Sequence, residues 1–529
     1  METKVVQKVI FRVDASEDIG SGHAVRCQTL ARELCDRGME CIFVCRDLKG
    51  NMIERFRHRG FNVMVLPQHG DTSIAAASEL DQPPAPKHSK WLGTDWLSDA
   101  NETIAAFADN APPEWLVVDH YALDYRWESR MRPYAKRIMV IDDLADRKHD
   151  CDLLLDQTLL TDMEERYDDL VPCRCARLLG PQYALLQPEY VSLRPRAPPR
   201  LNQIRRVLVF FGGVDQHNVT GLAVSAFLAL GRSDVVLDVV LSSQCPHAAA
   251  VREQAGGHTN VVVHESFPSL APLILSADLA LGAGGATSLE RCCLGLPSLV
   301  ITIADNQKHI AAELDRRKLI QWLGHHDAVT LQALVQALKH VIEKPEIESW
   351  SRQCMKVVDG NGTSRVASLL ELESSTPLVV RLAQLRDEAL LLRWANDPLV
   401  RTKSFTSDPI LAETHRRWFY RRLRNTDCCR IYVVETEQKS LPIGQVRFDR
   451  VIAKDDTWEI GYSIDSVARG RGLGTQMLDE AIRELCRNEK HASLLGRVKV
   501  HNMPSQAAFD RLGFTKQLED GRLVYRRSF

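Results

Sequence analysis

The sequence has no long apolar stretch. Nowhere in its 529 residues do side chains stay apolar for the roughly 18 positions that a membrane-spanning helix needs. The opening segment, from Met1 to Ile10, also has no extended apolar core of the kind found in secretory signals. These absences predict a soluble, cytoplasmic protein that makes no use of a membrane.

The sequence also lacks an excess of charge of either sign. Lys and Arg number 67 against 69 Asp and Glu, which gives a formal net charge of −2. A nucleic-acid-binding protein normally shows a basic footprint, so this class is not expected. Local basic pairs such as Arg416-Arg417 are typical of a solvated helix face.

The 14 cysteines include no Cys-x-x-Cys pair. Their other spacings, such as the adjacent Cys292 and Cys293, match no zinc motif. Most stand among apolar residues, where a free cysteine behaves as a small hydrophobic side chain. We therefore expect a reducing compartment, no disulfide framework and no metal site.

The length is enough for about three domains, and the first third alternates between apolar strands and helices. Alternation of this kind predicts a parallel sheet covered by helices, here as a first α/β domain over residues 1–195. The expected strands are Lys8–Val13, Cys41–Cys45, Phe61–Leu66, Trp115–Asp119 and Arg137–Asp142, with helices at His23–Arg37 and Met52–Arg59.

A stretch rich in Pro and Arg, Leu193–Arg200, is predicted to be a linker. A second alternating series follows over residues 202–370, so the fold class is α/β with two facing Rossmann-like halves. Ligands of such folds bind in the crevice at the carboxyl ends of the strands. The expected strands here are Arg206–Phe211, Val235–Leu241, Asn260–Val263, Asp278–Leu281 and Ser298–Thr302.

The pattern changes after a short polar segment at Glu371–Pro377. Two predicted helices, Leu385–Asn396 and Glu413–Leu423, precede a run of strands, a glycine-rich turn and a long helix. We expect residues 378–529 to form an α+β domain.

The first motif follows the first predicted strand and opens a helix. Gly20 and Gly22 let the backbone approach a ligand at a helix N-terminus, where free N–H groups favour phosphate. His23 comes next, and an imidazole that titrates near neutrality suits general-base work on a water molecule. A capping or purely structural histidine is the alternative.

Two glycine-rich turns in the second half complete the predicted crevice. Gly213 follows the first strand of that half. The loop with Gly284 and Gly285 enters a helix, where Thr287 and Ser288 supply hydroxyl groups. Glu290 lies one turn further on and can accept both ribose hydroxyls, and Asn306 belongs to a polar cluster at the end of the next strand. A plain helix N-terminus with an ion-paired Glu290 is the alternative.

These motifs resemble two related families. The Gly-x-Gly-His opening and the Gly-Ala-Gly-Gly-Ala-Thr-Ser-Leu-Glu loop resemble the two-domain, GT-B-like glycosyltransferase that adds N-acetylglucosamine to the peptidoglycan lipid. Over residues 8–365 the chain is more similar to the UDP-sugar hydrolase family of pseudaminic acid biosynthesis, through Arg12-Val-Asp14-Ala-Ser16, His23 and Arg26, Val118-Asp119-His-Tyr121 and Ile141-Asp142-Asp143.

The hydrolase resemblance implies that water displaces UDP from UDP-2,4-diacetamido-2,4,6-trideoxy-β-L-altropyranose, with no obligatory metal. It implies that His23 is the base and that Glu290 and Asn306 hold the nucleotide. Asp14 and Asp119, at strand ends on the same edge, are possible supporting carboxylates, with turn or cap roles as the alternative. Direct attack by water predicts inversion at the anomeric carbon.

The fourth motif is the glycine-rich turn Arg469–Thr475, between a predicted strand and a long amphipathic helix. Backbone N–H groups of such a turn can bind a pyrophosphate. With Gly461-Tyr462 before it and Leu512-Gly513-Phe514 after it, residues 378–529 resemble the Gcn5-related N-acetyltransferases (GNAT). The resemblance implies acetyl-CoA as cofactor, with these residues near it: Arg469, Gly470, Arg471, Gly472, Gly474, Thr475 and, along the pantetheine arm, Asn502.

One position departs from the GNAT pattern. Many members carry Tyr as general acid where this chain has Phe509. Solvent or another group then has to protonate the thiolate, or the activity is weak. Glu459, on the strand beside the amine site, is a candidate base, and a surface ion pair is the alternative.

Acetylation of the 4-amino group and loss of UDP are consecutive steps in pseudaminic acid synthesis, so the combination favours one bifunctional enzyme. A glycosyltransferase, a hydrolase for another UDP-diamino sugar, and a nucleotide-sugar-binding module with a degenerate acetyltransferase are the rivals. The Ala-, Pro- and Ser-rich segment Gly70–Gly93 is a candidate for a mobile loop over the site.

Overall fold

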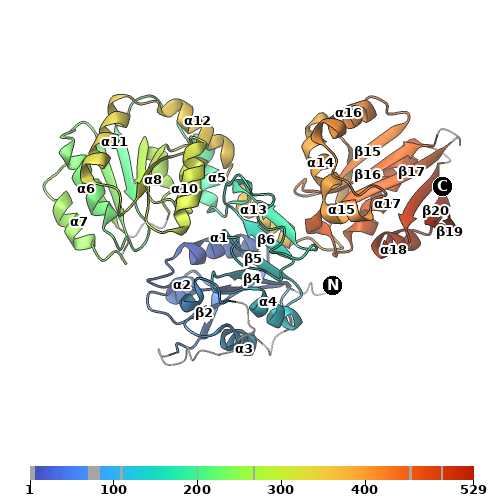
Figure 1. Cartoon of the computed structure of the whole chain (residues 1–529), viewed down its shortest axis with the longest axis horizontal. Helices are drawn as coiled ribbons and strands as arrows, with labels where there is room; N and C mark the ends of the chain where they lie inside the picture. Colours follow the sequence, from blue (N-terminus) through green and yellow to red (C-terminus); the bar gives the residue numbers. More distant parts are fainter. Residues whose placement is uncertain are drawn as a thin grey trace. The chain divides into compact units, whose positions relative to one another are not determined.

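The computed structural model describes residues 6–69, 84–107, 111–198, 200–242, 244–265, 269–451, 456–489 and 492–529. Most of the predicted loop Gly70–Gly93 lies outside these residues. The chain divides into two compact units, one reaching to Ala367 and one that holds Ser368–Phe529. The helices and strands of both units are labelled in Figure 1. Within the described residues no helix is both long and apolar enough to cross a bilayer.

The first sheet has the strand order β3-β2-β1-β4-β5-β6-β7. Its central pairs, from β3 to β6, are parallel. The strands are β1 (Lys8–Val13), β2 (Glu40–Arg46), β3 (Asn62–Leu66), β4 (Trp115–Asp119), β5 (Ile138–Ile141), β6 (Leu153–Asp156) and β7 (Ala176–Leu179).

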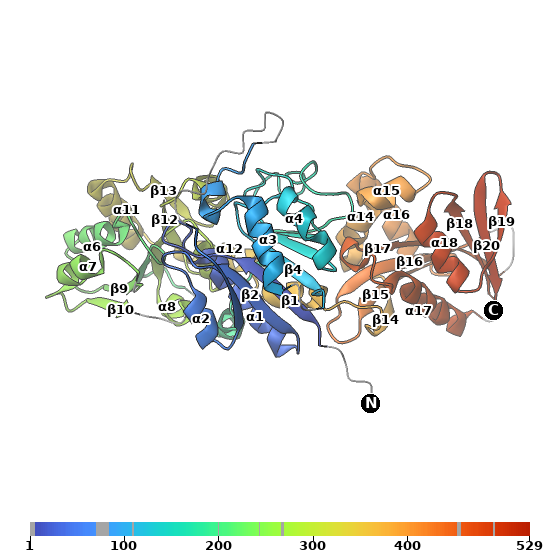
Figure 2. The same ribbon diagram turned by 90° about the horizontal axis from the view of Figure 1, so that it is seen from below.

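Helices cover both faces of this sheet. α1 (Gly22–Asp36) and α2 (Ile53–His58) lie on one side, and α3 (Trp96–Phe107) and α4 (Tyr125–Met131) lie on the other, as Figure 2 shows. The strand order reverses between β1 and β4. The loops after these two strands therefore leave in opposite directions and open a crevice at their carboxyl ends.

The second sheet repeats this arrangement with the order β10-β9-β8-β11-β12-β13, and it reverses between β8 and β11. Its strands are β8 (Arg206–Phe210), β9 (Val236–Leu241), β10 (Val261–Glu265), β11 (Leu279–Gly282), β12 (Ser298–Thr302) and β13 (Gln321–His325). Its helices are α6 (Val219–Ala229), α7 (Ala248–Ala255), α8 (Ala271–Ser276), α9 (Thr287–Cys293), α10 (Asn306–Arg316), α11 (Leu331–Glu343) and α12 (Ile347–Val357).

The predicted linker is held against the second half. It forms the end of α5 (Pro188–Leu193) and a short 3-10 turn, Arg194–Arg196. Arg200 is buried and donates from Nε to the carbonyl of Gly295, 2.8 Å away, and from Nη2 to that of Ile274, also 2.8 Å away. These carbonyls lie near helix C-termini, where a cation is favoured. Composition predicted a linker, and the burial of Arg200 holds that linker against the second half.

Helix α13 (Gly362–Leu370) returns to the first half. A Cβ on Gly362 would lie 2.3 Å from the carbonyl oxygen of Ala184, so only glycine permits this approach. Thr363 donates to the carbonyl of Leu186 at 2.8 Å. The chain therefore connects the two halves of this unit twice, once through the linker and once through α13. These two connections fix the crevice of one half relative to that of the other.

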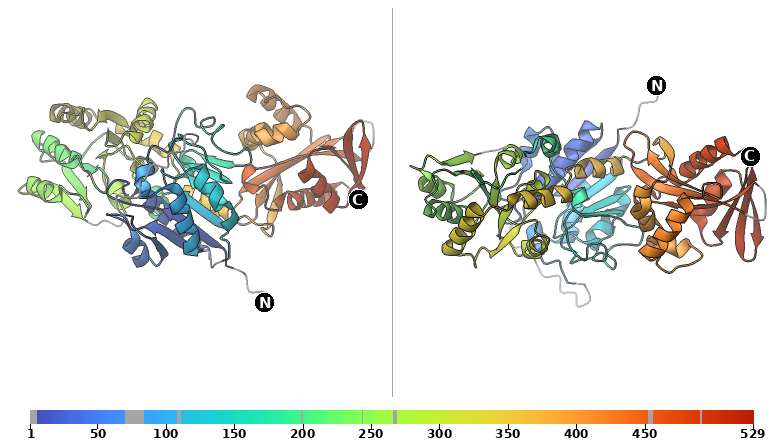
Figure 3. Two further views of the ribbon diagram at one scale, coloured as in Figure 1. Left: turned by 60° about the horizontal axis from the view of Figure 1, so that its bottom comes forward. Right: turned by 90° about the horizontal axis from the view of Figure 1, so that it is seen from above.

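The second unit is built on one mixed sheet of order β14-β15-β16-β17-β18-β20-β19. Helix α17 (Leu473–Asn488) packs on one face and α14 (Glu388–Asn396) and α16 (Ala412–Leu423) on the other, as Figure 3 shows. The remaining elements are β14 (Leu378–Leu382), α15 (Pro398–Lys403), β15 (Cys429–Thr436), β16 (Pro442–Arg450), β17 (Thr457–Ile464), β18 (Ser493–Lys499), α18 (Met503–Arg511), β19 (Thr515–Glu519) and β20 (Arg522–Ser528).

Strands β17 and β18 separate partway along their length. Their parallel pairing ends at Ile460 and Gly496, although β17 continues to Ile464 and β18 to Lys499. Each strand keeps its other neighbour, β16 or β20, to the end. The separation therefore exposes a free backbone edge of β17 inside the sheet.

Candidate functional site

A cavity of about 840 Å³ lies between the two halves of the first unit. Loops that follow β1, β4, β8 and β11 form its walls, so both points of strand reversal open into it. The halves approach closely here, since a Cβ on Gly213 would lie 3.4 Å from Ser21 Oγ. The nine residues predicted to bind substrate all line it: Gly20, Gly22, Gly213, Gly284, Gly285, Thr287, Ser288, Glu290 and Asn306.

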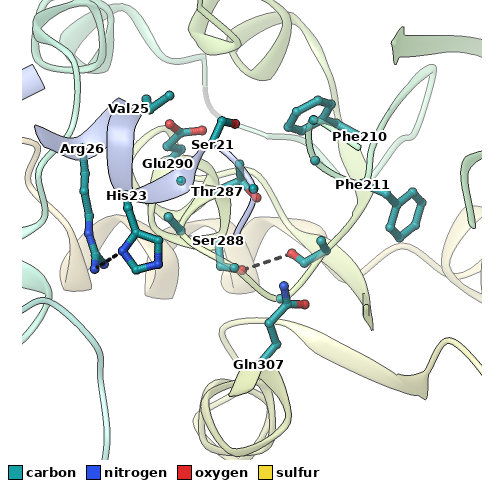
Figure 4. A pocket seen from close by; sticks show the side chains of 18 of the residues that line it. Ser21, His23, Val25, Arg26, Phe210, Phe211, Thr287, Ser288, Glu290 and Gln307 are labelled. Atoms are coloured by element: carbon teal, nitrogen blue, oxygen red, sulfur yellow. Dashed lines mark hydrogen bonds between the residues drawn. The ribbon is translucent and has the colours of Figure 1, made fainter. Parts of the chain in front are cut away.

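His23 stands at the start of α1 with its ring largely buried and its edge in the cavity. Its Nδ1 lies 2.6 Å from Asp119 Oδ1, at the end of β4. Figure 4 shows the ring beside Arg26, one turn further along the same helix. A donor bond from Nδ1 to a carboxylate fixes the tautomer and leaves Nε2 as the proton acceptor.

Arg26 holds Asp119 in place. It donates from Nε to Oδ2 and from Nη2 to Oδ1, both at 2.7 Å. Burial alone would raise the pKa of Asp119, but the charges and hydrogen bonds of Arg26 and His23 outweigh it and hold that pKa well below its usual range. Asp119 therefore stays ionised and can stabilise a protonated His23.

Tyr121 and Asp143 complete the surroundings of His23. The Tyr121 ring meets the imidazole edge to face, with centroids 4.4 Å apart. Its hydroxyl donates to Asp143 Oδ1, and Arg26 Nη1 donates to Asp143 Oδ2 at 3.0 Å. Both residues line the cavity. Both residues belong to motifs that resemble the hydrolase family, but the sequence did not predict their contact with His23.

Asp14, predicted to be catalytic, does not line the cavity. It is fully buried at the end of β1, where Oδ1 accepts from Arg12 Nη1 and from the backbone N–H of Arg46, both at 2.7 Å. Arg12 and Arg46 in turn bind Asp99, on α3. The carboxylate thus belongs to a buried ionic network behind the site, because a side chain at that strand position points into the core.

Glu290 lies deep in the cavity, on α9. Its neighbour is Tyr190 of α5, which donates a hydrogen bond to it, and its Oε2 has no partner among the described residues. Burial raises the pKa of Glu290, which the bond from Tyr190 and the charge of Arg291 offset in part. Figure 4 shows Glu290 near Thr287. A buried carboxylate oxygen without a donor suits a hydroxyl-bearing ligand.

Arg291 stabilises the glycine-rich loop at Gly284 and Gly285 by hydrogen bonds to residues on either side of it. It donates from Nη1 to Thr287 Oγ1 at 3.2 Å and from Nη2 to Ser288 Oγ at 3.0 Å. A Cβ on Gly282 would lie 2.5 Å from Nη1 of the same arginine, so the glycine makes room for it. Both hydroxyl oxygens therefore accept from Arg291, which holds the loop in place at the cavity.

The cavity also contains two arginines that the sequence did not single out. Arg55, within α2, and Arg59, just past its end, both line the cavity. Neither has a carboxylate partner in the part of the chain that the structure describes. Arginines without counterions in a cavity favour an anionic ligand.

The second unit has its own cavity, of about 1030 Å³, beside the separated strands. The free edge of β17 and the turn before α17 form part of its wall. Helix α17 begins without a side-chain cap or an acidic residue in its first turn, and its cap, Gly472, has a φ of 80°. The predicted cofactor residues that line the cavity are Arg469, Gly470, Gly472, Gly474, Thr475 and Asn502.

These features fit a coenzyme A molecule. An unpaired strand edge can hydrogen-bond to the amides of a pantetheine arm, and the open helix N-terminus can bind a pyrophosphate. A Cβ on Gly474 would meet only Ile464 Cδ1, at 3.8 Å, so the turn is open toward the cavity.

Two predicted residues of this unit are engaged elsewhere. Arg471 does not line the cavity; it is buried and donates from Nη1 to the carbonyls of Leu369 at 2.6 Å and Leu372 at 3.0 Å. Both carboxylate oxygens of Glu459 accept from Arg497 Nη1, at 2.8 and 2.7 Å. Arg471 therefore anchors the segment that leads into the unit, and the ion pair of Glu459 makes it a poor candidate for a base.

Comparison with known proteins agrees with this division of the chain. Residues 378–515 match the family model of the acetyltransferase (GNAT) domain. Over 142 residues the chain is 30% identical to YwnH of Bacillus subtilis, a protein named as an acetyltransferase, and covers 85% of it. Acetyl-CoA as cofactor is thereby confirmed.

The first unit has a different set of relatives. The chain is 22% identical over 311 residues to the UDP-2,4-diacetamido-2,4,6-trideoxy-β-L-altropyranose hydrolase of Campylobacter jejuni; the match spans 59% of this chain and 97% of that one. MurG of Acinetobacter baumannii shares the fold over 69% of this chain and 99% of its own, with a TM-score of 0.50 at 12% identity. The predicted fold class is confirmed.

One relative matches this chain over nearly its whole length, across both the hydrolase-like and the acetyltransferase part. Protein MJ1062 of Methanocaldococcus jannaschii is 19% identical over 529 residues, which cover 98% of this chain and 99% of that protein. The C-terminal part of the chain belongs to the GNAT acetyltransferase family, and it is fused to a part homologous to a UDP-sugar hydrolase.

Proposed function

We propose that the chain carries out two consecutive steps of pseudaminic acid synthesis in the cytoplasm, where acetyl-CoA and nucleotide sugars are available. The second unit acetylates the 4-amino group of a UDP-4-amino-4,6-dideoxy sugar. The first unit then hydrolyses UDP-2,4-diacetamido-2,4,6-trideoxy-β-L-altropyranose to the free sugar and UDP. The observation that carries this proposal is the His23–Asp119 pair at a cavity between two Rossmann-like halves.

In the hydrolysis step, His23 Nε2 takes a proton from a water molecule. The water oxygen forms a bond to the anomeric carbon on the face opposite UDP, and the bond to the UDP oxygen breaks with its electron pair staying on UDP. Asp119 stabilises the protonated imidazole, and Arg26 keeps Asp119 ionised. Attack from the opposite face predicts inversion. A positioned general base of this kind contributes roughly 10²–10⁴-fold to the rate.

The second half provides the nucleotide subsite. Glu290 would accept hydrogen bonds from the ribose hydroxyls, since its Oε2 is buried and has no partner in the described residues. The loop at Gly284 and Gly285 would donate backbone N–H groups to the diphosphate, and Asn306 would lie beside the nucleotide. Arg55 and Arg59 add positive charge at the same cavity, which lowers the barrier to departure of an anionic leaving group.

The acetyltransferase cavity favours an anionic acceptor. Its basic lining residues are Arg401, Lys403, Arg447, Arg469, Arg497, Lys499 and Arg511. Arg401 and Lys403 have no carboxylate partner among the described residues, and the lining carboxylate, Glu459, is bound by Arg497. A polyamine or a basic peptide would find no free carboxylate in this lining. A nucleotide diphosphate sugar matches the charge better.

The hydrolysis step is tested with the diacetamido UDP-sugar alone, followed by proton NMR. We expect UDP and a free sugar of inverted anomeric configuration from the wild type, with no requirement for acetyl-CoA. UDP release that depends on an added sugar acceptor would identify a glycosyltransferase instead. Release only from a different UDP-diamino sugar would keep the chemistry and change the substrate.

A further inference from the structure

The position at which many acetyltransferases carry an acidic tyrosine holds a buried hydrocarbon ring in this chain. Phe509 is 2% exposed and stacks on Tyr525, with ring centroids 5.0 Å apart. A Cβ on Gly496 would lie 2.6 Å from its Cζ, so the tip of the ring rests on β18 where the strands separate. Phe509 can donate no proton, and the sulfur that leaves during acetyl transfer needs one from another group.

The side chain of Tyr462 lies beside this ring. It stands on β17 two residues past Ile460, where the pairing with β18 ends, and it lines the cavity. Its ring meets Phe509 edge to face, with centroids 6.2 Å apart. A hydroxyl is thus present in the same aromatic cluster, supplied by the strand rather than by α18.

The Tyr462 hydroxyl is held by a second hydroxyl. It donates to Ser505 Oγ at 2.9 Å, in the first turn of α18, and Ser505 also lines the cavity. When Tyr462 gives its proton to a ligand, Ser505 can rotate and donate to the phenolic oxygen instead. Burial raises the pKa of Tyr462, which the bond to Ser505 offsets in part. The hydroxyl therefore keeps its proton at neutral pH.

We propose that Tyr462 is the proton donor to the coenzyme sulfur and takes the place that Phe509 cannot fill. As the acceptor nitrogen bonds to the acetyl carbon, the carbon–sulfur bond breaks and its electron pair stays on sulfur, which takes the Tyr462 proton. The surplus proton on nitrogen leaves to solvent, and solvent restores the proton on Tyr462. The proposal rests on the GNAT assignment of this unit, and it holds for any amine acceptor.

The chain offers a matched control. Tyr525 belongs to the same ring cluster, is fully buried, and has a hydroxyl with no partner among the described residues. It does not line the described cavity wall. Tyr525→Phe and Tyr462→Phe therefore each remove one hydroxyl from one cluster, but only the second removes it from the cavity.

In steady-state assays with the UDP-4-amino sugar, we expect Tyr462→Phe to lower kcat about 100-fold, with the KM for acetyl-CoA unchanged. Tyr525→Phe should keep kcat within about twofold of the wild type, as expected of a hydroxyl outside the reaction. Equal kcat values for the two variants, or a loss confined to KM, would overturn the proposal.

A second readout needs no acceptor and no turnover. The thiolate of bound coenzyme A absorbs in the ultraviolet, so its formation can be followed as the pH rises. Donation from Tyr462 stabilises the thiolate, and the bound thiol should titrate at lower pH in the wild type and Tyr525→Phe than in Tyr462→Phe. Identical titrations in all three would contradict the proposal. A difference here without acetylation of the amino sugar would retain Tyr462 and reject the proposed acceptor.

Discussion

The two cavities of this chain differ in the groups that form them: mainly side chains in the first and mainly backbone in the second. The cavity of the first unit depends on polar side chains far apart in sequence, with His23 of α1 and Asp119 of β4 separated by 96 positions. The cavity of the second unit depends on backbone: a strand edge without a neighbour and a glycine turn at a helix start. The first should therefore be sensitive to single polar substitutions, and the second to the shape and charge of the turn.

The largest expected effect is in the first cavity. His23→Gln removes the proposed base and should lower kcat for UDP release by about 10³-fold, while acetylation of the amino sugar continues at the wild-type rate. The control is His258→Gln, because His258 is exposed and does not line the cavity. NMR quantification of UDP and of acetylated UDP-sugar measures both reactions in one sample. A comparable loss in both reactions would point to unfolding.

The two aspartates at the strand ends separate a proton-relay role from a structural one. Asp119→Asn should lower kcat at least about 10²-fold, because an amide cannot stabilise the correct tautomer or the protonated ring. Asp14→Asn breaks a buried ionic network and should lower the stability of the first unit by about 3–5 kcal/mol instead.

Denaturant unfolding and kcat per folded molecule distinguish these outcomes. If Asp14→Asn protein that is still folded loses as much kcat as Asp119→Asn, the original assignment of Asp14 as catalytic is restored.

In the second cavity, charge at the turn is the sensitive feature. Gly474→Asp places a carboxylate where the pyrophosphate is expected, and the KM for acetyl-CoA should rise at least about tenfold, the equivalent of 1.4 kcal/mol. Gly474→Ala adds an uncharged methyl group that the protein has room for, so the KM should rise less than in Gly474→Asp. UDP release from the diacetamido sugar should not change in either variant. An unaltered KM in Gly474→Asp would place the pyrophosphate elsewhere.

The smallest effect concerns acid stability. Asp99 and Asp119 have pKa values below their usual range because the charges of buried arginines outweigh the effect of burial. A depressed pKa stabilises the fold above the unfolded pKa, roughly 3.9, and this contribution is lost as the pH falls toward the folded value. Thermal unfolding should show a plateau from pH 5 to 7 and a falling Tm below about pH 4. A Tm that stays constant to pH 2.5 would contradict the assigned networks.

The difference between the cavities also explains what the sequence could predict. The alternating pattern predicted most strands of the first two sheets to within a residue or two, because buried parallel strands are short apolar runs. The turn at Gly470–Gly474 could also be predicted, because its residues are consecutive in the sequence.

The sequence could not identify the partner of His23. Asp14 and Asp119 both follow apolar strands, and only the strand order shows that β1 and β4 are neighbours at the point of reversal. Both carboxylates are buried, and the structure separates them by their partners: Asp119 contacts His23, whereas Asp14 accepts from Arg12 and Arg46. Arg55, Arg59 and Tyr190 carry no motif and were missed for that reason.

The most direct test of the proposed pathway is a coupled assay of the intact chain. The UDP-4-amino sugar is supplied with and without acetyl-CoA, and UDP and the anomeric proton are followed by NMR. The account predicts no UDP without acetyl-CoA, UDP and an inverted free sugar with it, and accumulation of the acetylated UDP-sugar in His23→Gln. Acetylated UDP-sugar that accumulates in the wild type, with no UDP released, would contradict it.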